Sequence, residues 1–85
     1  MADHIHTHSK RLRRPDGAEY EVRIYGAARG DGTWMGWLEF HDVHGRAPVL
    51  RTGQETSQPD RRALDYWAGG LEPVYLDGAL ARARA

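Results

Sequence analysis

The sequence contains no cysteine among its 85 residues. A disulfide bond, a thiolate-ligated zinc site and a thiol nucleophile within this chain are therefore excluded. It also lacks any apolar run approaching the roughly 20 residues of a membrane-spanning helix, so we expect no membrane span. The polar, basic N-terminal segment has no apolar core of the kind found in secretory signals, and we expect a cytoplasmic protein.

A net charge is also absent, because twelve basic residues balance twelve acidic ones. The balance is uneven along the chain. Residues 1–14 carry Lys10, Arg11, Arg13 and Arg14 against one acidic residue, which gives +3, and the remainder therefore carries −3. Only the N-terminal segment has the basic character that favours contact with nucleic acid.

Hydrophobic residues make up 40% of the sequence and include three Trp, a composition that favours a folded core. At this length we expect one domain with a small core, for which self-association would be stabilising. Residues 1–16 show no apolar period and are predicted to form a flexible, basic, His-rich arm. Residues 17–85 are predicted to form a single small α+β domain.

Three segments have the composition of β-strands. The first, AEYEVRIYGA, alternates cleanly, whereas the second, TWMGWLEFHDV, is apolar on both sides. The third, RAPVLRT, contains Pro48, so we expect either that it lies at a sheet edge or that Pro48 stands at its start. Asp31-Gly32 and His44-Gly45 supply tight turns between them. The pattern predicts a three-stranded antiparallel meander with the second strand in the middle.

The period then changes to that of a helix in TSQPDRRALDYWAGG. Ser57 is the candidate N-cap, with Pro59 in the first turn and Asp60 at the capping-box position. Two glycines end this helix, and a second helix is predicted to begin at Pro73. The short connection favours packing of both helices on one face of the sheet, giving a βββαα layout with one or two C-terminal helices.

The doubly apolar second strand raises the question of what covers each of its faces. Trp34, Leu38 and Phe40 are expected to meet the first helix, with Gly36 permitting close approach. On the opposite face, Met35 and Trp37 are either covered by the C-terminal helix or left open as a partner site, and we favour the open face. Such aromatic residues also commonly cover only their cross-strand neighbours. The candidate binding residues on this face are Arg23, Tyr25, Met35, Trp37, Glu39 and His41.

Metal binding and catalysis find little support in the residue pattern. His4, His6 and His8 alternate and could gather Zn²⁺, Cu²⁺ or Ni²⁺ on one side of an extended chain, but a polar arm explains them equally, so we assign no metal site and no cofactor. Ser9 and Ser57 are the only serines, and neither is accompanied by a base and an orienting group. We therefore expect a protein that is not an enzyme.

The segments YEVRIY, GTWMGWLEF and TSQPDRRALDYWA, within residues 18–68, resemble two small DNA-binding domains at the level of pattern. These are the plant ethylene-response-factor domain and the arm-binding domain of phage-type integrases, in which a three-stranded sheet enters the major groove. The resemblance implies these base-contacting residues: Arg23, Trp37, Arg46 and Arg51. Glu19, Glu21 and Glu39 depart from the pattern, since they would share that surface and repel phosphate.

The tail ALDYWAGGLEPVYLDGALARA resembles small uncharacterised bacterial proteins, and this similarity implies no function. The sequence thus predicts a non-enzymatic binding or self-association module, with a protein partner or a homodimer formed through the aromatic, mixed-charge face. The alternative is a nucleic-acid-binding domain in which Lys10, Arg11, Arg13 and Arg14 contact phosphates. A steep salt dependence of binding would separate the second from the first.

Overall fold

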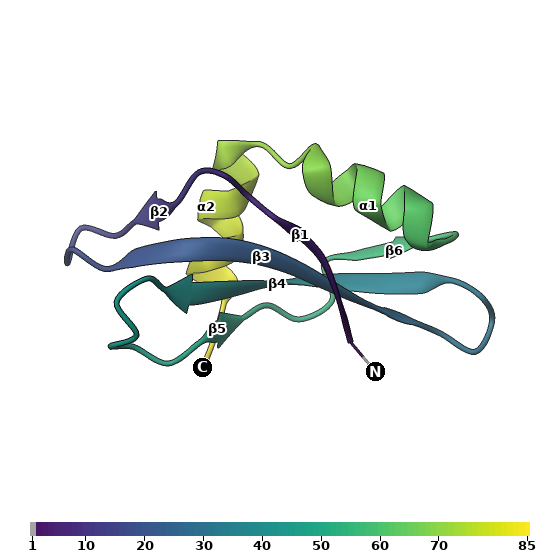
Figure 1. Cartoon of the computed structure of the whole chain (residues 1–85), viewed down its shortest axis with the longest axis horizontal. Helices are drawn as coiled ribbons and strands as arrows, with labels where there is room; N and C mark the ends of the chain where they lie inside the picture. The colour runs from purple at the N-terminus through teal and green to yellow at the C-terminus, as the bar shows by residue number, and fades with distance from the viewer. Residues whose placement is uncertain (1) are drawn as a thin grey trace.

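The computed structural model describes residues 2–85, which form an α+β fold with a six-stranded antiparallel sheet and two helices (Figure 1). The elements are β1 (Asp3–Thr7), β2 (Leu12–Arg13), β3 (Glu19–Ala28), β4 (Trp34–Asp42), β5 (Leu50–Arg51), β6 (Thr56–Gln58), α1 (Arg61–Gly69) and α2 (Pro73–Arg82). The strand order is β1-β3-β4-β5, with β2 paired to β3 and β6 paired to β4. The predicted α+β class is confirmed, whereas six strands replace the three expected.

The long β3–β4 hairpin is the centre of the sheet. Its strands pair from Tyr20 opposite Asp42 to the last pair beside the turn. At that turn Gly32 has a φ of 89°, and the Asp31 carboxylate accepts a hydrogen bond of 3.0 Å from the Thr33 amide. This confirms the Asp-Gly turn predicted from sequence, since only glycine adopts such a φ without strain.

The N-terminal segment is ordered, which corrects the flexible arm predicted for residues 1–16. β1 and β2 both pair antiparallel with β3, while Met1 lies outside the described residues. Ile5 packs against the core and Leu12 is buried. Because the hairpin would otherwise expose the edge of β3, a segment with only two large aliphatic residues gains enough backbone pairing to form strands.

Of the predicted third strand, residues 46–52, only Leu50 and Arg51 form a strand, β5. β6 lies beyond it, in the segment predicted to begin the first helix, and the two short strands pair with different parts of β4. Pro48 precedes β5. Between the two strands lies Thr52, whose buried hydroxyl accepts the Leu38 amide hydrogen at 3.0 Å. A side chain therefore supplies one of the hydrogen bonds of β4 where the chain bends, and this cannot be seen in a strand periodicity.

The start of α1 differs from the prediction, whereas the start of α2 agrees with it. Asp60, not Ser57, is the N-cap of α1, and its side chain accepts a 2.8 Å hydrogen bond from the Ala63 amide. Ser57 instead belongs to β6, which pairs with β4 up to Gln58. Pro73 opens α2 as predicted. Within residues 2–85, neither helix has the length and apolar character to cross a membrane.

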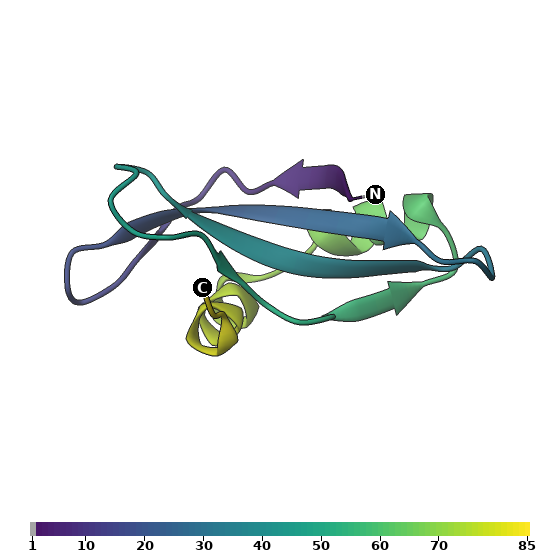
Figure 2. The same cartoon turned by 90° about the horizontal axis from the view of Figure 1, so that it is seen from below.

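Both helices pack against the same hydrophobic core on one face of the sheet. Figure 2 shows α2 on one side of the strands, and the hydrophobic core fills the space between the helices and the sheet. Gly26 and Gly36 are opposite each other on β3 and β4, beneath Leu64 of α1. A Cβ on either glycine would lie 2.4 or 2.7 Å from a Leu64 methyl group. The predicted role of Gly36 in close helix approach is therefore confirmed, and Gly26 shares it.

Candidate binding surface

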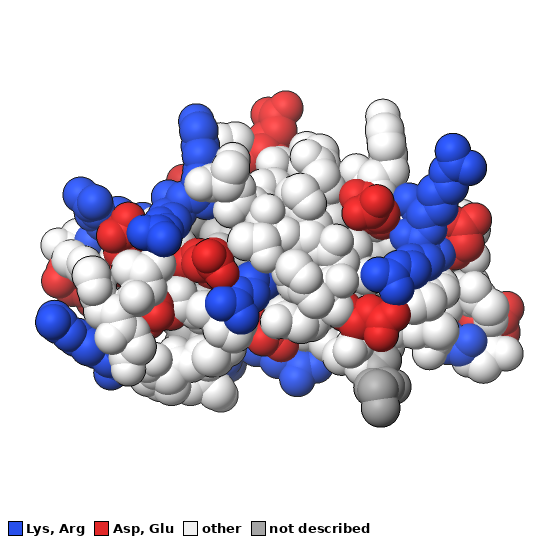
Figure 3. Space-filling view, viewed as in Figure 1, with Lys and Arg blue, Asp and Glu red and all other residues white. Residues whose placement is uncertain are grey.

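The central hairpin has one face turned away from the helices, here called the outer face. This is the face predicted from the sequence as the candidate binding surface. In Figures 1 and 2 no helix lies over it. Its side chains come from alternate positions of the two long strands, namely Glu19, Glu21, Arg23 and Tyr25 of β3 and Met35, Trp37, Glu39 and His41 of β4. Figure 3 shows basic and acidic side chains interspersed in this view, with uncharged atoms between them.

Four residues at the middle of the outer face alternate between acidic and basic side chains in both directions. Across the strands, Glu21 is opposite His41 and Arg23 is opposite Glu39. Along the strands, Arg23 Nε donates to Glu21 Oε1 at 2.7 Å, and His41 Nε2 lies 3.0 Å from Glu39 Oε1. The hydrogen bond from Arg23 lowers the pKa of Glu21, so this carboxylate stays ionised. These four residues form a mixed-charge square.

Trp37 is only 4% exposed, so the expectation that its ring lies exposed on an open face is wrong. The Arg51 guanidinium lies 4.5 Å from the centre of the Trp37 ring, and the Tyr25 ring stacks beside it at 6.4 Å. The indole Nε1 donates to Glu39 Oε2 at 3.2 Å. Neither an open face nor the C-terminal helix accounts for Trp37, because a side chain from β5 covers it.

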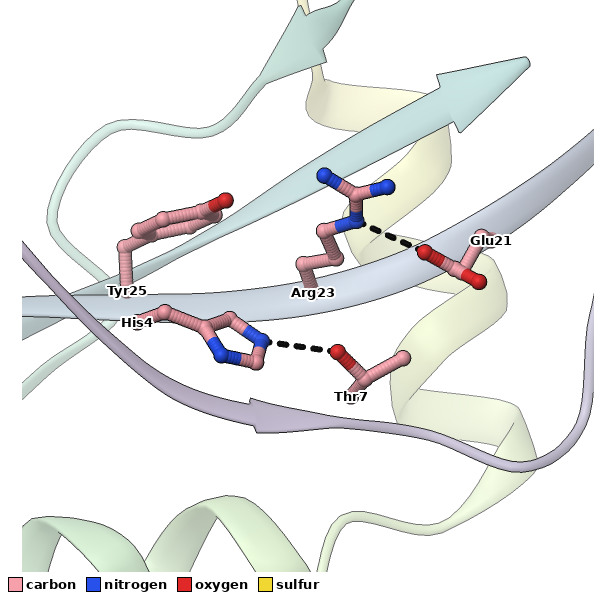
Figure 4. A pocket seen from close by; sticks show the side chains of 5 residues that line it. All are labelled: His4, Thr7, Glu21, Arg23 and Tyr25. Atoms are coloured by element: carbon pink, nitrogen blue, oxygen red, sulfur yellow. Dashed lines mark hydrogen bonds and ion pairs between the residues drawn. The ribbon is translucent and has the colours of Figure 1, made fainter. Parts of the chain in front are cut away.

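Two hollows flank the mixed-charge square. The first, about 280 Å³, is lined by His4, Thr7, Glu21, Arg23 and Tyr25. Figure 4 shows Arg23 and Tyr25 rising from β3 and His4 from β1, with His4 Nε2 bonded to the Thr7 hydroxyl at 2.7 Å. Glu21 and Arg23 also line the second hollow, of about 200 Å³, and therefore form the ridge between the two.

The remaining predicted face residue, Met35, lies away from this centre. It pairs with Ala27 on β3 and with Ser57 on β6, towards the turn of the hairpin. The structure thus brings Arg23, Glu39 and His41 together with Glu21, and leaves Met35 at the end of the face.

The four basic residues of the predicted nucleic-acid arm do not form one track. Arg14 turns to the core side, where its guanidinium lies 5.6 Å from the centre of the buried Tyr20 ring. Arg13 forms a 3.8 Å ion pair with a β3 carboxylate. Arg11 reaches the second hollow of the outer face, and Lys10 is exposed between β1 and β2. Their charges are therefore directed to different sides of the molecule.

His4 separates from the other two alternating histidines, whose ring centroids lie 4.8 Å apart. The pairing of β1 with β3 shifts between His4 and His6, so the alternation expected of a regular strand is broken. His4 contacts the Tyr25 ring on the outer face, whereas His8 Nε2 lies 3.0 Å from the Ala68 carbonyl oxygen of α1. Among residues 2–85, no three potential ligands are close enough to hold a metal ion. The one-sided arrangement predicted for them is therefore wrong.

His41 and Glu39 are arranged like an imidazole base with an orienting carboxylate. In the part of the chain that the structure describes, the only hydrogen bond of the His41 side chain is to Glu39. Together with Glu21 and Arg23, this arrangement presents acidic and basic side chains in fixed positions.

Comparison of the chain with protein-family models, with curated proteins and with solved structures finds no match.

Proposed function

We propose that this chain is a non-enzymatic binding module that associates with a second copy of itself through the outer face. The alternating charge of the mixed-charge square carries the proposal. A homodimer with two-fold symmetry requires a surface that is complementary to itself, and a patch of single charge fails this requirement. A square in which acidic and basic side chains alternate meets it.

The geometry of the square supports a specific pairing. Consider a two-fold axis that lies between two outer faces, runs perpendicular to the strands and passes over β3 midway between positions 21 and 23. Arg23 of one copy then faces Glu21 of the other, and the reverse contact forms at the same time. The same rotation places Glu39 of one copy against His41 of the other, which is attractive when the imidazole is protonated.

The size of the face also suits association. The whole molecule has principal extents of 42 × 23 × 18 Å, so the area of one side is comparable to the roughly 800 Å² that each partner buries in a stable interface. A chain of 85 residues has a small core, so burial of more surface would add to its stability.

Nucleic-acid binding is supported less well by the same residues. Carboxylates of Glu21 and Glu39 lie on the face that would approach phosphate, and this costs affinity. Trp37 is buried and therefore cannot stack on a base without displacement of Arg51.

Sedimentation equilibrium tests the proposal directly. We expect the wild type to dimerise, and Glu21→Arg and Arg23→Glu each to dissociate, because each reversal sets like charges against each other in both symmetric contacts. An equimolar mixture of the two variants should regain dimers, since the heterodimer again opposes Arg to Glu.

Matched controls reverse charge on the helical side of the molecule. Glu72→Arg and Arg62→Glu change exposed residues by the same amounts and should leave the dimer intact. A monomeric wild type, or a dimer that survives both reversals on the outer face, would overturn the proposal. A monomer that binds oligonucleotides with a steep salt dependence would establish the nucleic-acid alternative instead.

A further inference from the structure

A groove separate from the outer face runs between the β1–β2 connection and the start of α2. It has a volume of about 370 Å³ and is lined by His8, Ser9, Lys10, Arg11, Leu12, Leu71, Pro73 and Leu76. This volume falls towards the lower end of the roughly 300–1,000 Å³ typical of small-molecule sites. The groove therefore suits one small ligand.

The floor of the groove is aliphatic and comes from two different elements. Leu12 of β2 and Leu76 of α2 are 9% and 3% exposed, and Leu71 packs partly buried beside them. Because these side chains are fixed in the core, the floor offers a preformed surface for a short hydrocarbon chain.

The rim of the groove is polar and basic. Lys10 is exposed and forms no ion pair within residues 2–85, and the Ser9 hydroxyl lies next to it in the chain. Arg11 lines both this groove and the second hollow of the outer face. No carboxylate is among the lining residues, although Glu72 lies between two of them in sequence. An unneutralised cation at the mouth favours an anionic head group.

His8 forms a fixed wall at the same end. Its ring bonds to the Ala68 carbonyl oxygen, and burial lowers its pKa below the ordinary value. The lowered pKa favours the neutral imidazole, and the bond joins the residue that follows β1 to α1, so Lys10 and Arg11 are the cationic groups among the lining residues.

From this combination of an aliphatic floor and a cationic rim, we propose that the groove binds a small amphipathic anion of the class of short-chain to medium-chain aliphatic carboxylates. The hydrocarbon chain lies on Leu12, Leu71 and Leu76, and the carboxylate accepts from the Lys10 ammonium and the Ser9 hydroxyl. The proposal does not depend on self-association, because none of the groove's aliphatic residues belongs to the outer face.

Titration of the full isotopically labelled chain with octanoate, followed by amide chemical shifts, tests the proposal. We expect saturable shifts confined to residues 8–12 and 71–76. Acetate lacks the hydrocarbon chain and octylammonium has the opposite charge, so both should bind more weakly by about ten-fold or more. Absence of saturable shifts with octanoate, or equal binding of octylammonium, would overturn the proposal.

Two variants separate the groove from general charge effects. Lys10→Gln should weaken octanoate binding about three- to ten-fold, the loss expected for one charged hydrogen bond near solvent. Arg13→Gln removes the same charge from a neighbouring exposed residue that does not line the groove, and it should bind as the wild type does. Equal effects of the two variants, or shifts induced by an acidic peptide but not by octanoate, would reject a carboxylate site.

Discussion

The guanidinium of Arg51 lies 4.5 Å from the centre of the Trp37 ring and shields it from solvent. With the Tyr25 ring stacked on the same indole at an interplanar angle of 18°, Trp37 is buried on a face that no helix covers. This contact explains why β4 is apolar on both sides. One side of β4 packs against the helices, and on the other side Trp37 is buried beneath the side chains of Arg51 and Tyr25.

Replacement of Arg51 by Ala should expose Trp37. In a background of Trp34→Phe and Trp67→Phe, where Trp37 is the only tryptophan, Arg51→Ala should red-shift the emission and increase quenching by acrylamide. The lost contact should lower the free energy of unfolding by about 0.5–2 kcal/mol. Arg46→Ala, an exposed turn residue, is the control. Unchanged quenching in the Arg51 variant would show that Trp37 is covered by other means.

The close approach of α1 to the sheet predicts a strong coupling between Leu64 and Gly36. An Ala at position 36 would place its Cβ 2.7 Å from a Leu64 methyl group, and such overpacking costs about 1–3 kcal/mol. Leu64→Ala removes a fully buried side chain at a cost of about 2–5 kcal/mol. Since the new methyl group partly fills that cavity, the double variant should lose less stability than the two single variants together. Urea denaturation measures the cycle, and simple additivity would contradict the packing described.

The long elements of this fold could be predicted because local patterns determine them. The alternation in β3, the turn at Asp31-Gly32 and the start of α2 at Pro73 each depend on neighbouring residues. The predicted start of α1 was wrong because Ser57 and Asp60 are both residues that favour the N-cap position, and only the pairing of β6 with β4 decides between them.

The N-terminal strands could not be predicted, because their stability comes from an edge of β3 that is distant in sequence. The candidate surface was predicted in part. Arg23, Glu39 and His41 are grouped as expected, whereas the cover on Trp37 was missed. The cover on Trp37 could have been inferred from the alternation of VLRT, which directs Arg51 to the outer face opposite Glu39.

At the bend between β5 and β6, the Thr52 hydroxyl accepts a hydrogen bond from β4 that a neighbouring strand would otherwise accept. This hydroxyl should contribute measurably to stability. Thr52→Val keeps the shape but leaves the buried Leu38 amide without its acceptor, at a cost of about 1–3 kcal/mol. Thr52→Ser retains the oxygen and should cost less, although it loses a methyl group. Thermal and urea denaturation of the two variants give the order, and equal losses would show that the hydrogen bond contributes little.

The link between Tyr75 of α2 and Glu55 predicts a loss of stability at alkaline pH. The Tyr75 hydroxyl donates to the Glu55 carboxylate, and burial followed by this bond raises the pKa of Tyr75 to about 12. The ordinary value of about 10 applies to the unfolded chain. Because folding favours the protonated phenol, this contribution is fully present below pH ~10 and is lost as the pH rises through about 12.

Tyr75→Phe should therefore lower stability at neutral pH by about 1 kcal/mol and flatten its decline above pH ~10. Tyr66→Phe removes a phenol that is 87% exposed and should preserve the decline seen in the wild type. Urea denaturation across the alkaline range, with the ultraviolet absorbance of tyrosinate recorded in parallel, measures both effects. An alkaline decline that is the same in Tyr75→Phe as in the wild type would assign it to other groups and remove Tyr75 as its source.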